Sequence, residues 1–335
     1  MNVPPQDVLR PRKKNKKILF WVLGSFLVIA LIAGGIVWAA LSKLQDFETI
    51  DNAFPEESTR PEANVPAEGQ DDPAMNILLL GSDSRADTST PVLDDLGNRA
   101  DTIMVAHIPS DRSGVQIMSI MRDSWVEIPG YGHSKINAAM AHGGVPLTVE
   151  TVEDIIDQRI DHVAVVDFNG FKNITDALGG VEVNNPRAFS YDDYQFQQGP
   201  ISLNGDEALT FVRSRNFSDG DYSRVENQQL FMKSVASEVL SRDTLTSPSK
   251  LNNLVEATTP YVALDGDFGA GTMVGLGASM SSVRAGDITS FTLPTAGLGT
   301  EGGGQSVVYI DWDELEEVQE RFKSDDLADY QPDPR

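Results

Sequence analysis

Residues 76–81 read Asn-Ile-Leu-Leu-Leu-Gly, an uninterrupted apolar run that ends at a glycine. A run this short, apolar throughout and stopped by glycine, is typical of a strand that is buried on both faces. Similar runs predict further strands at 102–108, 115–121, 162–168, 288–293 and 307–310.

Segments with helical spacing of apolar residues separate or follow these strands. They are 146–156, 169–178, 223–240, 251–261, 273–283 and 312–322. Strands that are apolar throughout and that alternate with helices indicate a sheet covered on both faces. We therefore expect an α/β domain over residues 74–323.

Upstream of this domain, residues 18–41 read ILFWVLGSFLVIALIAGGIVWAAL and contain no charge. A helix of that length would be about 36 Å long, enough to cross a hydrocarbon core of about 30 Å. The basic head at 1–17 predicts a cytoplasmic N-terminus, a single transmembrane helix and a domain outside the cell membrane. A cleaved signal peptide is the alternative, but its apolar region is usually shorter and ends at a small-x-small site.

Two segments show no regular period. Residues 42–73 are acidic and contain four prolines, which predicts a linker, although 44–53 could continue the anchor as a short helix. The tail at 324–335 is acidic and contains proline, which predicts a loose end.

Charge and cysteine content exclude several kinds of site. The formal net charge is −24, although the first seventeen residues are basic. A domain so acidic would repel nucleic acid, and it can bind an anion only through a local cluster of cations. The chain has no cysteine, which excludes disulfides, thiolate metal sites and cysteine nucleophiles.

Such cations occur in five short clusters at the ends of the apolar segments. The clusters are GSDSR at 81–85, RADT at 99–102, MRDS at 121–124 followed by KIN at 135–137, VRSR at 212–215, and DYSR at 221–224 followed by Gln228. We expect 135–137 to be a short helical stretch. In an extended chain Arg213 and Arg215 would point to one side, and in a helix Arg224 and Gln228 would share a face.

The composition of these clusters suits a pyrophosphate. Arginine offers a rigid fork of donors that matches paired phosphate oxygens, and aspartates at strand ends can hold Mg²⁺. Any one Asp–Arg pair could be a surface ion pair or a helix cap. Their recurrence in so acidic a domain favours one phosphate-binding site. The four histidines lack ligand spacing, and His107 and His162 are interpreted as packing or surface residues.

The order of the motifs then becomes informative. LLLGSDSR, NRADTIMVAHI, IMSIMRDSWVEIPG, KINAAMAHGG, VRSR and DYSRVENQQ follow a basic head and one anchor helix. This arrangement resembles the LytR-CpsA-Psr (LCP) family of bacterial cell-envelope phosphotransferases. The resemblance runs from about residue 75 to residue 240, and the chain up to residue 322 fits the closing part of that fold.

The resemblance implies a mixed central sheet flanked by helices and a hydrophobic channel for a polyprenyl tail. It also implies a phosphotransferase. The family moves a glycopolymer, with its linking phosphate, from a polyprenyl-pyrophosphate carrier to a hydroxyl on the wall, usually of peptidoglycan. The implied partners are the lipid-linked glycopolymer, the peptidoglycan acceptor and the membrane.

Residue roles follow from the matching motifs. Asp83 and Asp101 would hold Mg²⁺ or Mn²⁺. The groups that would contact or orient the pyrophosphate are Arg85, Arg99, Arg122, Lys135, Arg213, Arg215, Arg224 and Gln228. Arg122, Asp123, Asp221 and Arg224 would be catalytic, with either Asp123 or Asp221 as the base. One departure is Asn227, which stands where many members have a second arginine. One cation fewer is expected to weaken the phosphate grip or to mark a different polymer.

Two other functions stay open from sequence. A pyrophosphatase that uses water as acceptor would need the same site. A non-catalytic lipid- or wall-binding adaptor or regulator would not need the chemistry at all. No helix-turn-helix pattern is present, and the acidic domain speaks against DNA binding. Phe168, Phe171, Phe211 and Phe231 could line a lipid channel or belong to an ordinary core.

Overall fold

The computed structural model describes residues 47–67, 69–82, 92–95, 100–214 and 221–332. The predicted basic head at 1–17 and the apolar run at 18–41 lie outside these ranges. Within the described ranges, no helix combines the length and the apolar character needed to span a bilayer.

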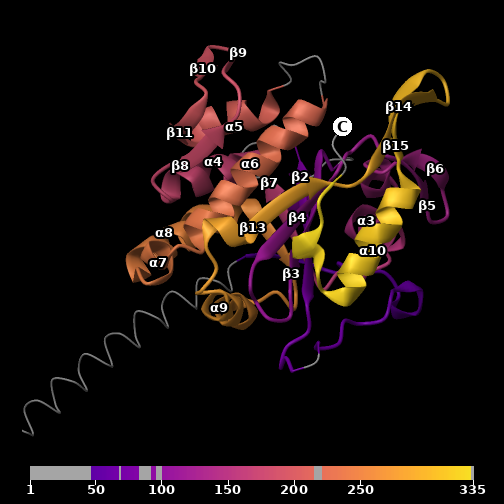
Figure 1. Ribbon diagram of the computed structural model, residues 1–335, viewed down its shortest axis with the longest axis horizontal. Coiled ribbons are helices and arrows are strands. Elements are labelled where there is room, and N and C mark those ends of the chain that lie inside the picture. Colours follow the sequence, from indigo (N-terminus) through magenta and orange to yellow (C-terminus); the bar gives the residue numbers. More distant parts are fainter. Residues whose placement is uncertain (1–46, 68, 83–91, 96–99, 215–220, 333–335) are drawn as a thin grey trace, which may run out of the picture.

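A seven-stranded mixed sheet forms the centre of the fold (Figure 1). Its strands, in spatial order, are β1 (Glu48–Ile50), β12 (Val262–Asp265), β7 (His162–Asp167), β2 (Met75–Ser82), β3 (Thr102–Ile108), β4 (Val115–Ile120) and β13 (Ile288–Thr292). The β1–β12, β7–β2 and β4–β13 pairs are parallel, and the remaining pairs are antiparallel. The prediction of a mixed sheet is confirmed.

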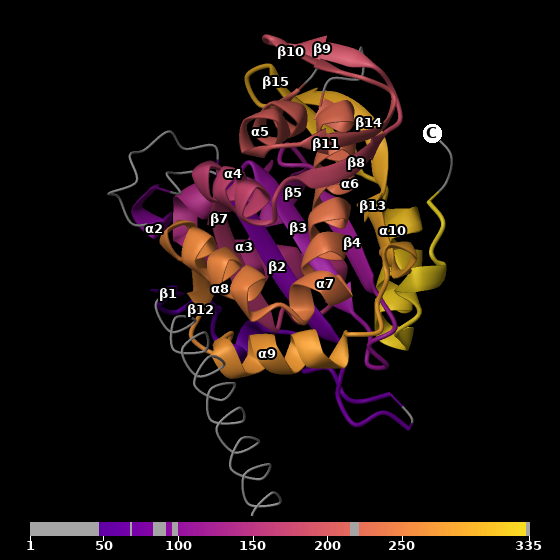
Figure 2. The same ribbon diagram turned by 90° about the vertical axis from the view of Figure 1, so that its left-hand side faces the viewer.

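The central strands are apolar because helices cover both faces of the sheet. Every residue of β4 is buried, and so is β3 after its first residue. On one face, α3 (Ala138–Ile156) and α10 (Trp312–Ser324) pack on Leu78, Val105 and Met118. On the other face, α6 (Asp221–Val239) and α9 (Ala270–Ser279) pack on Met104 and Ile117. Figure 2 shows α6, α7 (Arg242–Leu245), α8 (Pro248–Thr258) and α9 in front of the strands.

A second, smaller core lies beside the sheet at the start of α6. It is built from α4 (Phe168–Ala177), α5 (Gly205–Arg213), β8 (Val181–Asn185), β11 (Gly199–Leu203) and the short pair β9 (Phe189–Tyr191) and β10 (Tyr194–Phe196). Its centre is aromatic, with Phe211 and Phe231 fully buried. Gly179 and Gly180, both with positive φ, follow α4.

Two hairpins complete the fold. One is β5 (Trp125–Ile128) with β6 (Gly132–Lys135), and the other is β14 (Thr295–Glu301) with β15 (Gln305–Ile310). The remaining short elements are η1 (Glu57–Thr59), α2 (Val92–Asp95), η2 (Thr259–Tyr261), η3 (Ala285–Asp287) and η4 (Leu327–Asp329). Lys135 is therefore the last residue of a strand, and the expected helical stretch at 135–137 is wrong: α3 starts only at Ala138.

The folded part begins within the expected linker. Glu48–Ile50 form an edge strand parallel to β12, so the expected helix at 44–53 is wrong there. Farther along, Arg60 donates to the buried carboxylate of Glu153 at 2.7 Å. Burying that carboxylate without a cationic partner would be costly, which explains why an irregular segment is fixed to the domain.

The C-terminal segment is also ordered, contrary to the expected loose tail. Leu327 and Tyr330 are buried, and Asp325 accepts a hydrogen bond from the Ser110 backbone N–H at 2.9 Å. The other Asp325 oxygen lies 3.1 Å from Nε2 of His107. Two buried side chains and a buried polar partner thus outweigh the acidic, proline-containing composition of the tail.

Candidate active site

The sheet register brings three of the predicted clusters to one edge. Gly81 at the end of β2 pairs with Thr102 at the start of β3, and Ile103 pairs with Ile120 at the end of β4. Asp101 directly precedes Thr102, and Arg122 follows Ile120 after one intervening residue. The described parts of three motifs, residues 81–82, 101–102 and 121–124, therefore meet at the carboxyl ends of β2 and β4, where α/β proteins place ligands.

At this edge four of the predicted side chains form a charged network. Arg122 donates to the Asp101 carboxylate, and its Nε lies 3.7 Å from Oδ2 of Asp123. Nζ of Lys135 lies 2.9 Å from Oδ1 of the same Asp123. All four side chains are between 21% and 23% exposed, so each still reaches solvent. The network alternates acid and base, which holds two cations at a fixed separation.

Backbone hydrogen bonds fix this network. The Asp101 N–H donates to the Gly81 carbonyl at 2.8 Å, and the Asn137 N–H donates to the Arg122 carbonyl at 3.2 Å. The Val308 N–H, from β15, donates to the Asp123 carbonyl at 2.9 Å. Segments far apart in the chain therefore hold residues 101, 122 and 123. A charged site held by its scaffold does not have to be reorganised when an anion binds.

Helix α6 approaches the same edge. Val225 packs with Met121 and Val308 in a small buried cluster, and Tyr222 lies against it. Because Met121 precedes Arg122 and Val225 follows Arg224, this contact places the two motifs next to each other. The Arg224 side chain is buried, and Gln228 lies one turn farther along the helix. The expected shared helical face of Arg224 and Gln228 is confirmed.

Arg213 is the last residue of α5 and not part of an extended segment. Helix α5 starts with a capping box formed by Asn204 and Glu207, which fixes where the helix begins. Ser214 follows in an extended conformation and ends the helix. The cation of Arg213 therefore sits at a helix C-terminus, where positive charge is favoured.

Asn227, the departure from the family motif, turns toward the end of α5. Its Nδ2 donates to Oγ of Ser214 at 2.8 Å and to the Phe211 carbonyl at 3.3 Å. The side chain is 4% exposed. Asn227 thus holds Ser214, which lies between Arg213 and Arg215 in the sequence. The larger side chain of an arginine would not make these contacts in the same space.

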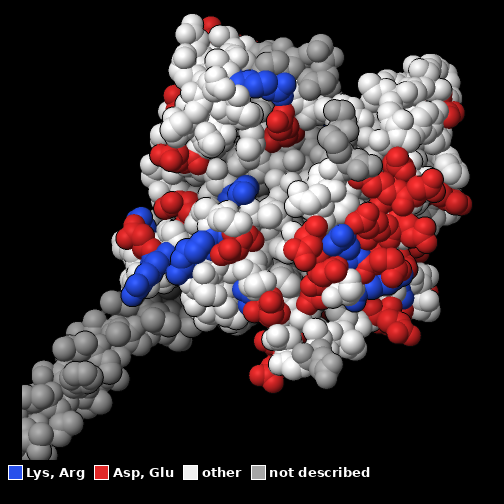
Figure 3. All heavy atoms as spheres, in the orientation of Figure 1, with Lys and Arg blue, Asp and Glu red and all other residues white. Residues whose placement is uncertain are grey.

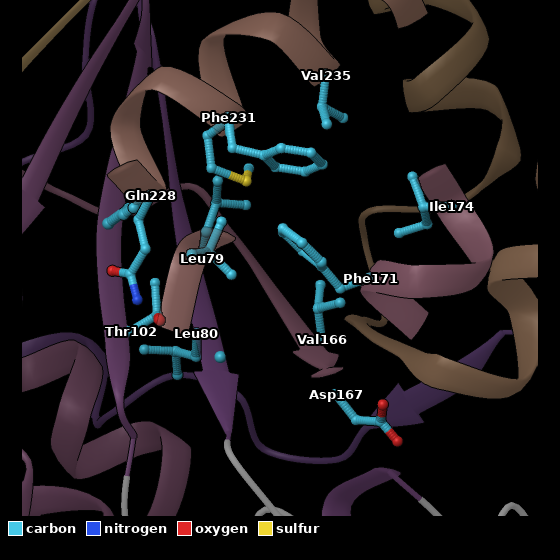
Figure 4. A pocket seen from close by; sticks show the side chains of 14 residues that line it. Leu79, Leu80, Thr102, Val166, Asp167, Phe171, Ile174, Gln228, Phe231 and Val235 are labelled. Atoms are coloured by element: carbon cyan, nitrogen blue, oxygen red, sulfur yellow. The ribbon is translucent and has the colours of Figure 1, made fainter. Parts of the chain in front are cut away.

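An apolar cavity lies at the same edge of the sheet, and Figure 4 shows side chains that line it. Its wall includes Gly81, Thr102, Val212 and Gln228, each next to or one helical turn from a charged residue of the site. Phe171 and Phe231 line it with ring centroids 4.4 Å apart, and Ile174 and Val235 line its far part. Its volume is about 110 Å³. Phe211 belongs to the smaller core, and the Phe168 side chain is outside the described set.

Sequence reasoning missed one polar residue of this cavity, Asp167, although it included Thr102 in the cluster at 99–102. Asp167 ends β7 opposite Ser82 of β2, and it is 9% exposed at the cavity rim, where its Oδ1 accepts the Gly170 N–H at 2.9 Å. Thr102 lines the other side. One sequence signal could have identified Asp167. It is an acidic residue near the end of the apolar run at 162–168, and that run forms a strand parallel to the one at 76–81.

Several predicted site residues lie outside the described residues. These are Asp83, Arg85, Arg99 and Arg215, together with the side chain of Asp221. Their placement at the site stays a prediction. Asp221 is the first residue of α6.

The described part of the site offers hard oxygen donors for a metal but not a complete set. No group of three or more His, Cys, Asp or Glu side chains suited to a metal occurs among the described residues. Mg²⁺ commonly takes only one or two carboxylates and completes its shell with water and substrate phosphate. The Asp101 carboxylate is an oxygen ligand of the kind that Mg²⁺ prefers, and it fits that requirement.

Two histidines are structural in the described fold. Nδ1 of His107 lies 2.8 Å from Oδ1 of Asn76, and Nδ1 of His162 lies 3.2 Å from Oδ2 of Asp265. Burial would raise the pKa of Asp265, but hydrogen bonds from His162 and Val163 outweigh it and lower that pKa. Of the two alternatives expected from sequence, packing or surface residues, both histidines match packing, since both are buried.

Taken together, the arrangement can bind an amphiphile with an anionic head. Cations stand at the rim, and an apolar cavity starts one residue away from them. A site of this kind would hold a phosphate in the charged network and a hydrocarbon chain in the cavity.

Comparison with known proteins agrees with this geometry. Residues 42–324 match the model of the LytR_cpsA_psr family. The polyisoprenyl-teichoic acid–peptidoglycan teichoic acid transferase TagU of Bacillus cereus (strain AH820) is 37% identical over 239 residues, covering 69% of this chain and 74% of TagU.

Two further proteins are similar over most of the chain. The cell wall biosynthesis protein LcpA of Corynebacterium glutamicum is 32% identical over 314 residues, which cover 78% of this chain but only 60% of LcpA. The crystal structure of B. subtilis TagV superimposes with a TM-score of 0.64 at 26% identity, covering 77% of this chain and 98% of TagV.

Proposed function

The chain belongs to the LytR_cpsA_psr family, and from that membership we propose that it is a cell-wall glycopolymer transferase. It transfers a glycopolymer, with its linking phosphate, from a polyprenyl-pyrophosphate carrier to a hydroxyl of peptidoglycan. The transferase name of the relative TagU supports this reaction class, and the name of LcpA supports a part in cell wall biosynthesis. The observation that carries the proposal is the charged network of Asp101, Arg122, Asp123 and Lys135 beside an apolar cavity.

The cavity sets how the donor lies. An apolar cavity of 150 Å³ is known to hold a benzene ring, so about 110 Å³ accommodates roughly one five-carbon prenyl unit. The unit next to the pyrophosphate would lie against the adjoining rings of Phe171 and Phe231, and the rest of the chain extends beyond the cavity. The pyrophosphate then reaches Arg122, Arg213 and Arg224 at the rim.

The reaction exchanges one P–O bond for another. The acceptor oxygen attacks the phosphorus that bears the glycopolymer, the bond to the prenyl phosphate breaks, and the prenyl phosphate departs with the electron pair. Arg122 and Arg224 stabilise the negative charge that builds up on the phosphoryl oxygens and the leaving group. The acceptor proton passes to a carboxylate.

Asp123 and Asp221 are the two carboxylates considered for that proton. Asp123 already contacts two cations, Lys135 and Arg122. This favours a positioning role for Asp123, which keeps both cations directed at the phosphate. Asp221, at the start of α6, is then the proposed base.

We also propose a metal ion and a membrane anchor. Asp101, with Asp83, would hold Mg²⁺, which supplies positive charge to the phosphate oxygens. Residues 18–41 would tie the domain to the outer leaflet, from which a lipid-linked donor is drawn. The oxygen donor of Asp101 supports the first proposal, and the uncharged run supports the second.

The test is an Arg122→Gln variant. Loss of one donor to the developing charge is expected to slow transfer by about 10²–10³-fold while the fold is kept. The readout is radiolabelled polymer carried from a polyprenyl-pyrophosphate donor into purified wall. Arg187→Gln, which removes a half-exposed pair with Glu226, is the matched control and should transfer normally.

Two outcomes would contradict the proposal. Full transfer by Arg122→Gln would show that the charged network has no part in the reaction. Release of polymer phosphate into solution by the wild type, with none entering the wall, would identify a pyrophosphatase instead.

A further inference from the structure

A second hollow, of about 460 Å³, is lined in part by the β5–β6 hairpin, whose last strand ends at Lys135. It is lined by Glu127, Pro129 and His133 of the β5–β6 hairpin, Asp154 of α3 and Trp312 of α10. Its size is within the range of small-molecule sites, about 300–1,000 Å³. None of these side chains has a part in the donor site described above.

Two residues that line the hollow share one face of the hairpin with Lys135 of the active site. Trp125 pairs with Lys135, and Glu127 pairs with His133, so all four side chains share a face. The alternate residues Val126 and Ile128 are buried in the main core, so this face is turned to solvent. His133 stands two residues from Lys135, a separation of about 7 Å along the strand.

The aromatic part of the hollow is exposed. Trp312 is 55% exposed, which is unusual for so large an apolar side chain. It is the first residue of α10, and the helix does not depend on it, because Asp311 caps the helix by accepting the Glu314 N–H. A flat ring held on a fixed helix, beside the ring of Pro129, offers a surface for stacking.

The polar part of the hollow carries acceptors. The carboxylates of Glu127 and Asp154 face the same space as Trp312. Partial burial, followed by repulsion from Glu150, Glu153 and Glu127, raises the pKa of Asp154. Figure 3 shows acidic side chains gathered over the part of the surface where Figure 1 places α10. Such a field repels the phosphate-rich donor polymer and so excludes it from this hollow.

The hairpin that carries these residues is rigid. Tyr131 at its tip stacks on His142 of α3, with ring centroids 4.3 Å apart and an interplanar angle of 14°. Gly130 and Gly132 on either side have positive φ, which glycine adopts without strain. A fixed hairpin keeps the hollow at a constant distance from Lys135.

We propose that this hollow binds the glycan strand of the peptidoglycan acceptor, with one sugar ring stacked on Trp312 and its hydroxyls donating to Glu127 and Asp154. A sugar ring has an apolar face of C–H groups and a rim of hydroxyl donors, which matches one aromatic plate flanked by carboxylates. The strand would run along Trp125 and His133 toward the phosphate at Lys135. This inference rests on the proposed transferase function, because it assigns that reaction's acceptor.

The first test measures binding without turnover. Full-length protein in detergent micelles is titrated calorimetrically with an uncharged N-acetylglucosamine hexamer. Trp312→Ala is expected to weaken binding by about tenfold or more, whereas Trp312→Phe, which keeps a ring, stays within about threefold of wild type. Leu298→Ala, at an exposed apolar residue of β14 outside this hollow, is the control and should bind normally.

The second test separates the acceptor from the donor. In the transfer assay, Trp312→Ala should raise KM for the glycan acceptor by about tenfold and leave donor KM and kcat within about twofold. A wild type that binds the hexamer but never transfers would overturn the proposed function and not the binding site. Absence of hexamer binding, unchanged acceptor KM in Trp312→Ala, or preference for a lysine-containing peptide would each overturn the glycan site.

Discussion

At the scale of single residues, the site depends on side chains that fix other side chains. Asn227 is the clearest case, because its amide reaches both Ser214 and the Phe211 carbonyl from within α6. The missing arginine is therefore not simply one cation fewer. The amide replaces a charge with a connection between α6 and the end of α5, and so orients the Arg213 motif.

Asn227→Ala should show this connection as both lower stability and lower activity. Removing a buried donor is expected to cost about 1–3 kcal/mol in the free energy of unfolding. A loosened Ser214 should also reduce transfer by about tenfold or more, since catalysis is sensitive to small displacements. Urea unfolding and the wall-transfer assay measure the two effects.

The control for this prediction is Asn253→Ala, at an exposed position of α8. It should change stability by no more than about 0.5 kcal/mol. Asn227→Ala could instead unfold at the same urea concentration as the wild type and transfer normally. The contact of Asn227 with the end of α5 would then contribute neither to stability nor to activity.

At the scale of elements, α6 joins the two halves of the donor site. Arg224, Gln228, Phe231 and Val235 are spaced by four, three and four residues, so they form one stripe along the helix. The stripe changes from charged to apolar in the same direction in which a prenyl pyrophosphate would run. One helix therefore sets the distance between head and tail.

Filling the far part of the cavity should separate tail binding from chemistry. Val235→Phe adds volume into a space of about 110 Å³ and is expected to be tolerated in stability, within about 1.5 kcal/mol. Its KM for a long-chain prenyl donor should rise by about tenfold, with little change for a donor that carries a methyl group in place of the prenyl chain. Ser237→Phe, two residues away and off the stripe, serves as the control.

Kinetics with donors of two chain lengths would decide this prediction. An equal rise of KM for both donors would show that Val235 does not contact the tail. An unchanged KM for both would place the tail outside the cavity.

Sequence reasoning succeeded for elements whose signal is local. The runs at 102–108 and 115–121 are apolar throughout because both of their faces are buried, and the structure has strands at both. β1 was missed because three residues carry no usable period, and their pairing with β12 is set by a segment more than two hundred residues later. Lys135 was misassigned because cross-strand pairing with Trp125 overrides the helical start that follows it.

The candidate site was only partly predictable for the same reason. The Asp101–Arg122 contact could be anticipated from two clusters at strand ends. The aromatic hollow could not, because Trp312 and Glu127 are far apart in sequence and meet only through α10 and β5 packing on the same core.

At the scale of the whole molecule, the C-terminal segment is locked to the centre of the sheet. Asp325 ends α10 in a left-handed conformation and accepts hydrogen bonds from Ser110, with His107 beside it. Burial would raise the pKa of Asp325, but the contacts with His107 and Ser110 outweigh it and lower that pKa. The Asp325 carboxylate is therefore ionised at neutral pH.

Stability should consequently depend on pH through Asp325. A carboxyl group whose folded pKa is lowered adds stability above its unfolded value of about 3.9, and that contribution is lost as pH falls from there through the folded pKa. Asp325→Ala should cost about 1.5–3 kcal/mol near neutral pH, and its deficit relative to wild type should shrink below about pH 4. Urea unfolding at several pH values measures both.

The matched control is Asp313→Ala, near the other end of α10 and exposed. A deficit for Asp325→Ala that is constant down to pH 3 (about one pKa unit below the ordinary value) would mean that the carboxylate charge has no part in the lock.

The strand order also bears on how the chain is made. The four central strands, β7-β2-β3-β4, are complete once residue 167 has been synthesised, but their flanking partners β12 and β13 begin only at residues 262 and 288. During the intervening synthesis, β7 and β4 present unpaired edges of the kind that promote aggregation. A nascent chain halted near residue 250 is thus a half-closed sheet, and biogenesis of this protein should depend on a chaperone that shields those two edges.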